Sequence, residues 1–200
     1  MLEAIKYNLT NLTNLHGRDA RSTFWFYVLF LVIMQFVVSF VIAMPFVGSM
    51  TGGAINAARE GATSAEMQGR IFAGVNSMMR ATMWTSVAIS FAMILLLAAS
   101  FTRRLHDSDK TGWIAAVVVA LQLIALTLTI ISIEDAVRLV VMSQSGDLAG
   151  VQSLQRRFAL QGLVGWLPVG VLVVFGAWPG TKGDNRYGPG PDGASGTTFH

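Results

Sequence analysis

The sequence contains no cysteine and few charged residues, and both absences limit what the protein can be. Without cysteine it can form no disulfide, no thiol nucleophile and no cysteine-based zinc or iron–sulfur site. Charged residues make up only 12% of the 200 positions, about half the share in soluble proteins, whereas apolar residues make up 53%. Lipid must therefore cover much of the surface. The formal net charge of +3 is too small for a nucleic-acid-binding surface.

Long apolar runs are abundant. A helix rises 1.5 Å per residue, so about 20 apolar residues are needed to cross roughly 30 Å of hydrocarbon. Four segments reach that length without a charged residue: Phe24–Phe46, Ala81–Phe101, Gly112–Ile133 and Phe158–Trp178. The first run is too long for the apolar region of a secretory signal peptide, so we expect it to remain as an anchor. The sequence predicts an all-α integral membrane protein with four transmembrane helices.

The four spans divide the chain into three parts. Residues 24–178 form the predicted membrane domain, and residues 1–23 form an N-terminal segment in which an interfacial helix is expected. Residues 179–200 form a tail rich in Gly and Pro, whose last ten residues are predicted to be disordered. Helical apolar spacing predicts helical outer arms between spans one and two and between spans three and four, with a turn at Gly146. These arms either cap the bundle or lie on the membrane surface.

The number of spans between two segments determines whether they share a side of the membrane. The N-terminal segment, the Thr102–Thr111 connection and the C-terminal tail are separated by pairs of spans, so they share one face. Of the 14 Lys and Arg residues, eight lie on that face and the other six on the opposite one. This bias predicts that both termini are cytoplasmic. Trp25, Trp113 and Trp178 then lie near the inner interface.

Three polar motifs fall on this inner face, namely Gly17–Trp25, Arg103–Trp113 and Pro179–Pro189. Together they resemble the bacterial inner-membrane family called domain of unknown function 805. The resemblance runs from about Tyr7 to Pro191 and rests on Gly17-Arg18, Arg21, Phe24-Trp25, the run Arg103-Arg104-Leu105-His106-Asp107, Gly112-Trp113, Asn185-Arg186-Tyr187-Gly188 and Pro189. It implies a multi-pass protein of the bacterial cytoplasmic membrane and brings no established activity.

The candidate binding residues all come from these motifs. They are Arg18, Arg21, Trp25, Arg103, Arg104, His106, Asp107, Asp109, Asn185, Arg186 and Tyr187. One interpretation is structural, with the arginines anchored at the interface and the aspartates paired with them. The other is that the arginines bind the phosphate of an anionic lipid headgroup. We expect one cluster centred on Arg103 and Arg104, in which Asp107 or Asp109 reaches an arginine from another motif.

Neither a metal nor a catalytic site is predicted. His106, Asp107 and Asp109 have the residue types of a metal site, but in so short a loop they more often pair with nearby arginines. The sequence contains no Gly-rich phosphate loop, Ser-His-Asp order or His-Glu-x-x-His pattern. The spans carry no charge of the kind that proton-coupled transport or intramembrane proteolysis needs. We therefore predict that the protein is not an enzyme and has no cofactor.

Two functions remain open at this stage. The leading prediction is a non-enzymatic membrane protein whose inner face binds anionic lipid headgroups or a partner, either another membrane protein or a second copy of the chain. The alternative is a small-solute channel or transporter, acting as an oligomer. Within span four, Gly162, Gly165 and Gly170 are expected to allow close helix packing.

Overall fold

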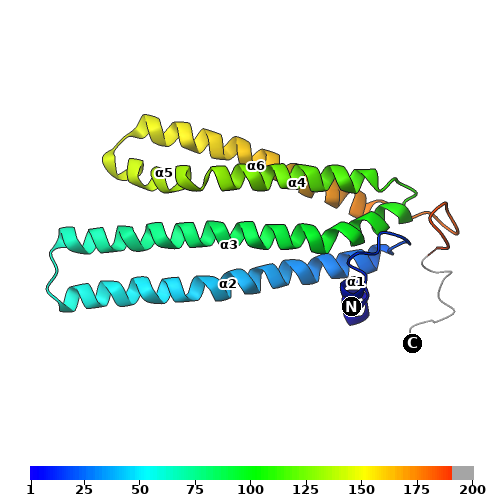
Figure 1. Ribbon diagram of the computed structural model, residues 1–200, viewed down its shortest axis with the longest axis horizontal. Coiled ribbons are helices and arrows are strands. Elements are labelled where there is room, and N and C mark those ends of the chain that lie inside the picture. The colour runs from blue at the N-terminus through cyan, green and yellow to red at the C-terminus, as the bar shows by residue number, and fades with distance from the viewer. Residues whose placement is uncertain (191–200) are drawn as a thin grey trace. The chain divides into compact units, whose positions relative to one another are not determined.

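The computed structural model describes residues 1–190, and residues 191–200, which include the predicted disordered end, lie outside the described residues. The side chains of Phe46, Val47, Ser49, Met50, Ala54, Ala58 and Gln144 are also outside the description. The described residues form no β-strand and six helices: α1 (Leu2–Thr10), α2 (Arg21–Arg59), α3 (Ser64–Asp107), α4 (Trp113–Ile131), α5 (Ile133–Ser145) and α6 (Leu148–Ala177) (Figure 1).

Four of these helices, α2, α3, α4 and α6, are long and apolar enough to cross a membrane. The predicted all-α membrane fold with four spans is thus confirmed.

The third span ends earlier than predicted, because α4 stops at Ile131 and α5 begins at Ile133. Between them the buried Ser132 hydroxyl bonds with the Gln161 amide (Gln161 Nε2 to Oγ, 2.8 Å), and Glu134 and Asp135 lie in the first turn of α5. Acidic residues there favour a new helix start through the helix dipole.

Both outer arms are helical, as predicted. The arm between spans one and two contains no separate helix, because α2 runs for 39 residues to Arg59 and α3 runs for 44 residues from Ser64. The Thr63 hydroxyl and the Glu66 carboxylate form a reciprocal capping box at the start of α3. The second arm consists of α5 and the start of α6, joined at Gly146, whose left-handed φ of 74° confirms the predicted turn.

The chain forms two compact units. Unit 1 contains Met1–Ile33, Ser90–Ala125 and the chain from Gly162 onward, and unit 2 contains Met34–Ile89 and Leu126–Gln161. All three polar motifs belong to unit 1.

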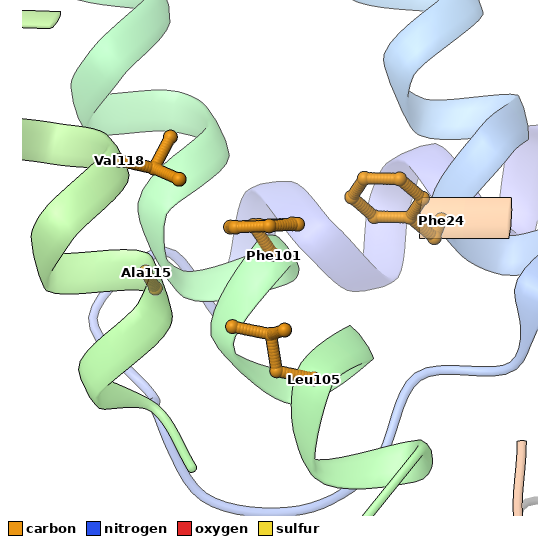
Figure 2. Close-up of a cluster of buried hydrophobic side chains, with 5 residues drawn as sticks. All are labelled: Phe24, Phe101, Leu105, Ala115 and Val118. Atoms are coloured by element: carbon orange, nitrogen blue, oxygen red, sulfur yellow. The ribbon is translucent and has the colours of Figure 1, made fainter. Parts of the chain in front are cut away.

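The core of unit 1 brings together side chains from three helices. Phe24 of α2, Phe101 and Leu105 of α3, and Ala115 and Val118 of α4 are all buried in one cluster (Figure 2). The Phe24 and Phe101 rings lie 6.1 Å apart between centroids, which is within the range of a favourable aromatic pair. Because lipid is as apolar as these side chains, close van der Waals contact rather than water exclusion holds the helices together.

Helix α6 approaches this core closely at Gly176. A Cβ atom built there would lie only 2.6 Å from Cε1 of Phe24, so only glycine fits this position without a shift. The glycines predicted to pack closely, Gly162, Gly165 and Gly170, have nothing within 4 Å of such a Cβ among the described residues. That prediction was wrong, because a glycine allows close packing only on the helix face that meets a partner.

Polar contacts join the helices of unit 2. Arg80 of α3 forms a two-pronged ion pair with Glu134 of α5 (2.5 and 2.8 Å), and Arg157 of α6 lies 2.6 Å from Asp135. The arginines and Glu134 are about half exposed, so each pair contributes roughly 1 kcal/mol or less.

Candidate functional site

The structure brings the three polar motifs together in unit 1, as predicted. Five charged side chains are buried at their centre, and we call them the polar cluster: Arg18, Asp19, Arg103, Arg104 and Asp107. Arg103, Arg104 and Asp107 come from the last turns of α3. Arg18 and Asp19 come from the segment just before α2. The expected position of Arg103 and Arg104 at the centre of the cluster is confirmed, since both are 0% exposed.

Arg103 ties the N-terminal segment to α3. Its Nε donates to Asp19 Oδ1 at 2.9 Å, and its Nη2 donates to Asn8 Oδ1 at 2.6 Å. Its Nη1 donates to the carbonyl oxygens of Asn11 and Asn14 at 2.9 and 2.5 Å. Three separate parts of the segment, the end of α1, the following turn and the stretch just before α2, therefore converge on one guanidinium group.

Asp19 is the carboxylate that balances Arg103. It also accepts a hydrogen bond from the Ser100 hydroxyl (3.1 Å), and its backbone N–H donates to the Arg103 carbonyl. Burial raises the pKa of the Asp19 carboxyl above the ordinary value, and the Arg103 guanidinium and the Ser100 hydroxyl oppose that rise. The ionised form of Asp19 thus depends on these two donors.

Asp107 is shared by two arginines from different motifs. Arg18 approaches Oδ1 through Nε (3.2 Å) and Nη2 (3.0 Å), and Arg104 donates to Oδ2 at 2.5 Å. Arg104 also donates to the carbonyls of Gly176 (3.0 Å) and Trp178. These carbonyls belong to the end of α6, where a cation is favoured by the helix dipole. The expected contact between Asp107 and an arginine of another motif is confirmed by Arg18.

Arg18 holds the C-terminal tail against the cluster. Its Nη1 donates to the carbonyl of Gly183 (2.7 Å) and its Nη2 to the carbonyl of Thr181 (2.8 Å). The Thr181 N–H in turn donates to the Asp107 carbonyl at 2.8 Å. A Cβ atom on Gly180 would lie 2.2 Å from Asp107 Oδ2, so the tail backbone presses directly on this carboxylate.

The rest of the third motif covers the connection between α3 and α4. The Tyr187 ring stacks on the His106 ring, with centroids 3.8 Å apart and planes 7° from parallel. The Asn185 amide donates to the His106 carbonyl (2.9 Å), and Arg186 pairs with Asp109 at 3.1 Å on the surface. No group of three or more potential metal ligands occurs among residues 1–190. The Tyr187 ring covers one face of the His106 ring.

A cavity of about 690 Å³ opens beside the polar cluster, between the start of α2 and the tail. Arg21, Ser22 and Trp25 line it from α2, and Lys182 and Asp184 line it from the tail. The first helical hydrogen bond of α2 is donated by Phe24 N–H, so the N–H groups before it have no partner within the helix. Such a helix start attracts anions.

The cations of the motifs now separate into two groups. Arg18, Arg103 and Arg104 are bonded to carboxylates and carbonyls inside the protein, so the structural interpretation holds for them. Arg21 and Lys182 are exposed in the cavity wall, and neither has an ion-pair partner within the described part of the chain. They are the cations of the cavity that remain able to bind an external anion.

The family comparison agrees with the arrangement of the motifs. A family model matches residues 12–189, which include all three polar motifs and the four span helices. The chain belongs to the family described as protein of unknown function, DUF805. The predicted resemblance is thus confirmed. No curated protein and no solved structure matches this DUF805 chain. Since the DUF805 description carries no activity, function has to be argued from the site.

Three charged residues of the site were not among the predicted binding residues. Lys182 and Asp184 line the cavity, and Asp19 balances Arg103. All three belong to the predicted motifs. The charge count of the motifs could have identified Asp19, because the motifs hold more arginines than Asp107 and Asp109 can balance.

Proposed function

We propose that this protein is a non-enzymatic, multi-pass protein of the bacterial inner membrane whose cytoplasmic face binds an anionic lipid headgroup in the cavity. The observation that carries the proposal is the pair of unpartnered cations, Arg21 and Lys182, in the cavity wall. The other motif cations already have partners: Arg186 pairs with Asp109, and Lys110 lies over the Trp178 ring. The cavity wall thus holds two motif cations that form no ion pair among the described residues.

The chemistry of the cavity suits a phosphate diester. The planar guanidinium of Arg21 can bind two phosphate oxygens, and Lys182 supplies a second positive charge. The start of α2 adds a partial positive charge on the same wall. Asp184 also lines the cavity, and its carboxylate can accept a hydrogen bond from a headgroup hydroxyl. Phosphatidylglycerol, which has one phosphate and two hydroxyls, offers both features.

The position of the cavity also supports a lipid rather than a soluble anion. Its wall includes Trp25, which lies one turn into the first span helix and donates from Nε1 to the Gly176 carbonyl (3.2 Å). Tryptophan side chains concentrate at the headgroup level of membranes. A ligand in this cavity would therefore lie level with the phosphates of the adjoining leaflet.

The proposed orientation predicts a definite topology. Reporter domains fused after residues 60, 107, 147 and 190 should be read outside, inside, outside and inside, because one span separates each site from the next and the positive-inside bias favours the motif side. The measurement is alkaline phosphatase and fluorescent-protein activity of each fusion in bacterial cells. The fully reversed pattern would exclude a cytoplasmic cavity, and any mismatch between the fusions at 107 and 190 would contradict a shared face.

Lipid binding should depend on the two cavity cations. The double substitution Arg21→Gln and Lys182→Gln should weaken phosphatidylglycerol binding at least about tenfold, since each charge-assisted bond contributes roughly 1.5–3 kcal/mol and 1.4 kcal/mol equals a factor of ten. Binding can be measured by native mass spectrometry of the full-length protein, titrated with phosphatidylglycerol or phosphatidylcholine.

The matched control carries Arg59→Gln and Arg156→Gln, which remove two exposed cations of unit 2 for which no ion pair occurs among the described residues. Both double variants lose the same charge, so a general electrostatic effect would weaken both equally. Equal affinity in the two variants, or equal binding of phosphatidylcholine and phosphatidylglycerol by the natural protein, would refute the cavity as a headgroup site.

A further inference from the structure

The short helix α1 has one face packed on the rest of unit 1 and an adjoining face, which we call the free face, that is exposed in the described part of the chain. Ile5 and Asn8 are buried on the packed face. On the free face Leu2 is 81% exposed and Leu9 is 41% exposed, with the exposed Lys6 between them in the sequence. At 100° per residue these three side chains fall within about 60° of one another around the helix. The free face of α1 is therefore apolar with one cation.

The packed face fixes the level of α1 along the span helices. Asn8 accepts from Arg103, which lies in the last turns of α3, and Asn11 at the end of α1 bonds to the same guanidinium. In Figure 1, α1 lies crosswise to the N-terminal part of α2, beside its end. A helix held crosswise at the end of a membrane span runs along the membrane surface.

The surroundings of the free face indicate what covers it. The apolar side chains of Phe26 and Leu29 are exposed on the N-terminal part of α2, in the same unit, and in a membrane they face lipid. The leucines of α1 are further exposed apolar side chains of the same unit. Moving a leucine side chain out of water is favourable. Lys6 has a long stem that can lie along the acyl chains while its ammonium group reaches the phosphates.

From this geometry we infer that α1 is an interfacial helix whose free face, with Leu2, Lys6 and Leu9, inserts into the lipid leaflet on the motif side of the membrane. The occupant of the free face is the leaflet itself, not a protein. Arg103 is then a positioning residue for this contact, because it clamps the packed face. The inference does not depend on which ligand fills the cavity.

The natural chain has no cysteine, so single-cysteine variants give clean labels. Leu2→Cys and Leu9→Cys test the free face, and Glu3→Cys and Thr10→Cys are controls on the same helix, exposed and about 80–120° away around the axis. Each full-length variant is labelled with an environment-sensitive fluorophore and placed in vesicles of phosphatidylethanolamine and phosphatidylglycerol. Lipids brominated on the acyl chains serve as quenchers.

The expected result is a blue-shifted emission at positions 2 and 9, with acyl-chain quenching at least twofold stronger than at positions 3 and 10. Equal, weak quenching at all four positions would place α1 in water and overturn the inference. A blue-shifted emission at positions 2 and 9 that disappears when the protein is diluted with lipid would show that a second copy of the chain covers the free face. That result would also overturn the inference. Unchanged thermal unfolding of each variant confirms that the fold is intact.

Discussion

Replacing Asp107 with asparagine should lower the free energy of unfolding by about 3–5 kcal/mol, the usual cost of removing one partner from a buried ion pair. Asp107 neutralises two guanidinium groups, Arg18 and Arg104, whose side chains are 1% and 0% exposed. Its loss leaves both positive charges buried, with only neutral carbonyl and hydroxyl oxygens as direct hydrogen-bond partners. The measurement is unfolding of the purified protein in detergent, followed by helix content.

The matched control for this variant is Asp109→Asn, two residues further along the same connection. Asp109 pairs with Arg186, and both side chains are about half exposed, so this substitution should cost about 1 kcal/mol or less. The two variants make the same change of charge and volume, one at a buried carboxylate with two arginine partners and the other at an exposed carboxylate with one. Comparable losses of stability would mean that the polar cluster is not the buried structural centre described above.

Replacing Arg103 with glutamine should release the N-terminal segment and reduce stability by a similar 3–5 kcal/mol. The guanidinium group bonds to Asp19, Asn8 and two carbonyls, and glutamine can replace only part of this set. Trypsin should then cut after Arg18 much faster than in the natural protein, a local effect that gel electrophoresis can follow. Arg156→Gln, on the exposed surface of unit 2, is the control and should leave cleavage after Arg18 unchanged.

The Arg103→Gln variant should also be less destabilised at low pH. Burial already raises the pKa of Asp19, and removing Arg103 takes away its main opposing charge, so the folded-state pKa rises further above the unfolded value. Between these two pKa values the folded state binds more protons than the unfolded state. Stability therefore increases as pH falls through the folded-state pKa and decreases as pH rises through it. A deficit that is the same at acidic and neutral pH would indicate that Asp19 is not the carboxylate left uncompensated.

The fold was largely predictable because membrane spans depend on long uncharged apolar runs, which can be read directly from the sequence. Uncharged runs such as Ala81–Phe101 can be counted, and the number of spans between motifs determines which of them share a face. The gathering of Arg18, Arg104 and Asn185 at one end of unit 1 followed from that count. The helix break at Ser132 was not predicted, because the apolar run continues through Ser132 and Ile133 although α4 stops at Ile131.

The partners of the buried arginines could not be predicted. Arg103 and Arg104 bond largely to backbone carbonyls, and every residue has a carbonyl, so no residue type marks Asn14 or Gly176 as an acceptor. For the same reason the sequence could not distinguish the arginines that are bonded inside the protein from Arg21, which has the same side chain but lies in the cavity wall. Burial, not residue type, separates the arginines that hold the fold from those able to bind a ligand.

Arg103 and Arg104 are neighbours in one helix, yet they hold opposite ends of the chain, and this constrains the order of assembly during synthesis. The partners of Arg103 precede the first span, so they are made before α3 leaves the ribosome. The carbonyl partners of Arg104 and Arg18 follow in α6 and the tail. A nascent chain with three spans inserted already contains Asp107, the carboxylate partner of Arg18 and Arg104, but still lacks the carbonyl partners of these two arginines. The hydrogen bonds of the polar cluster are therefore complete only when the last motif has been made.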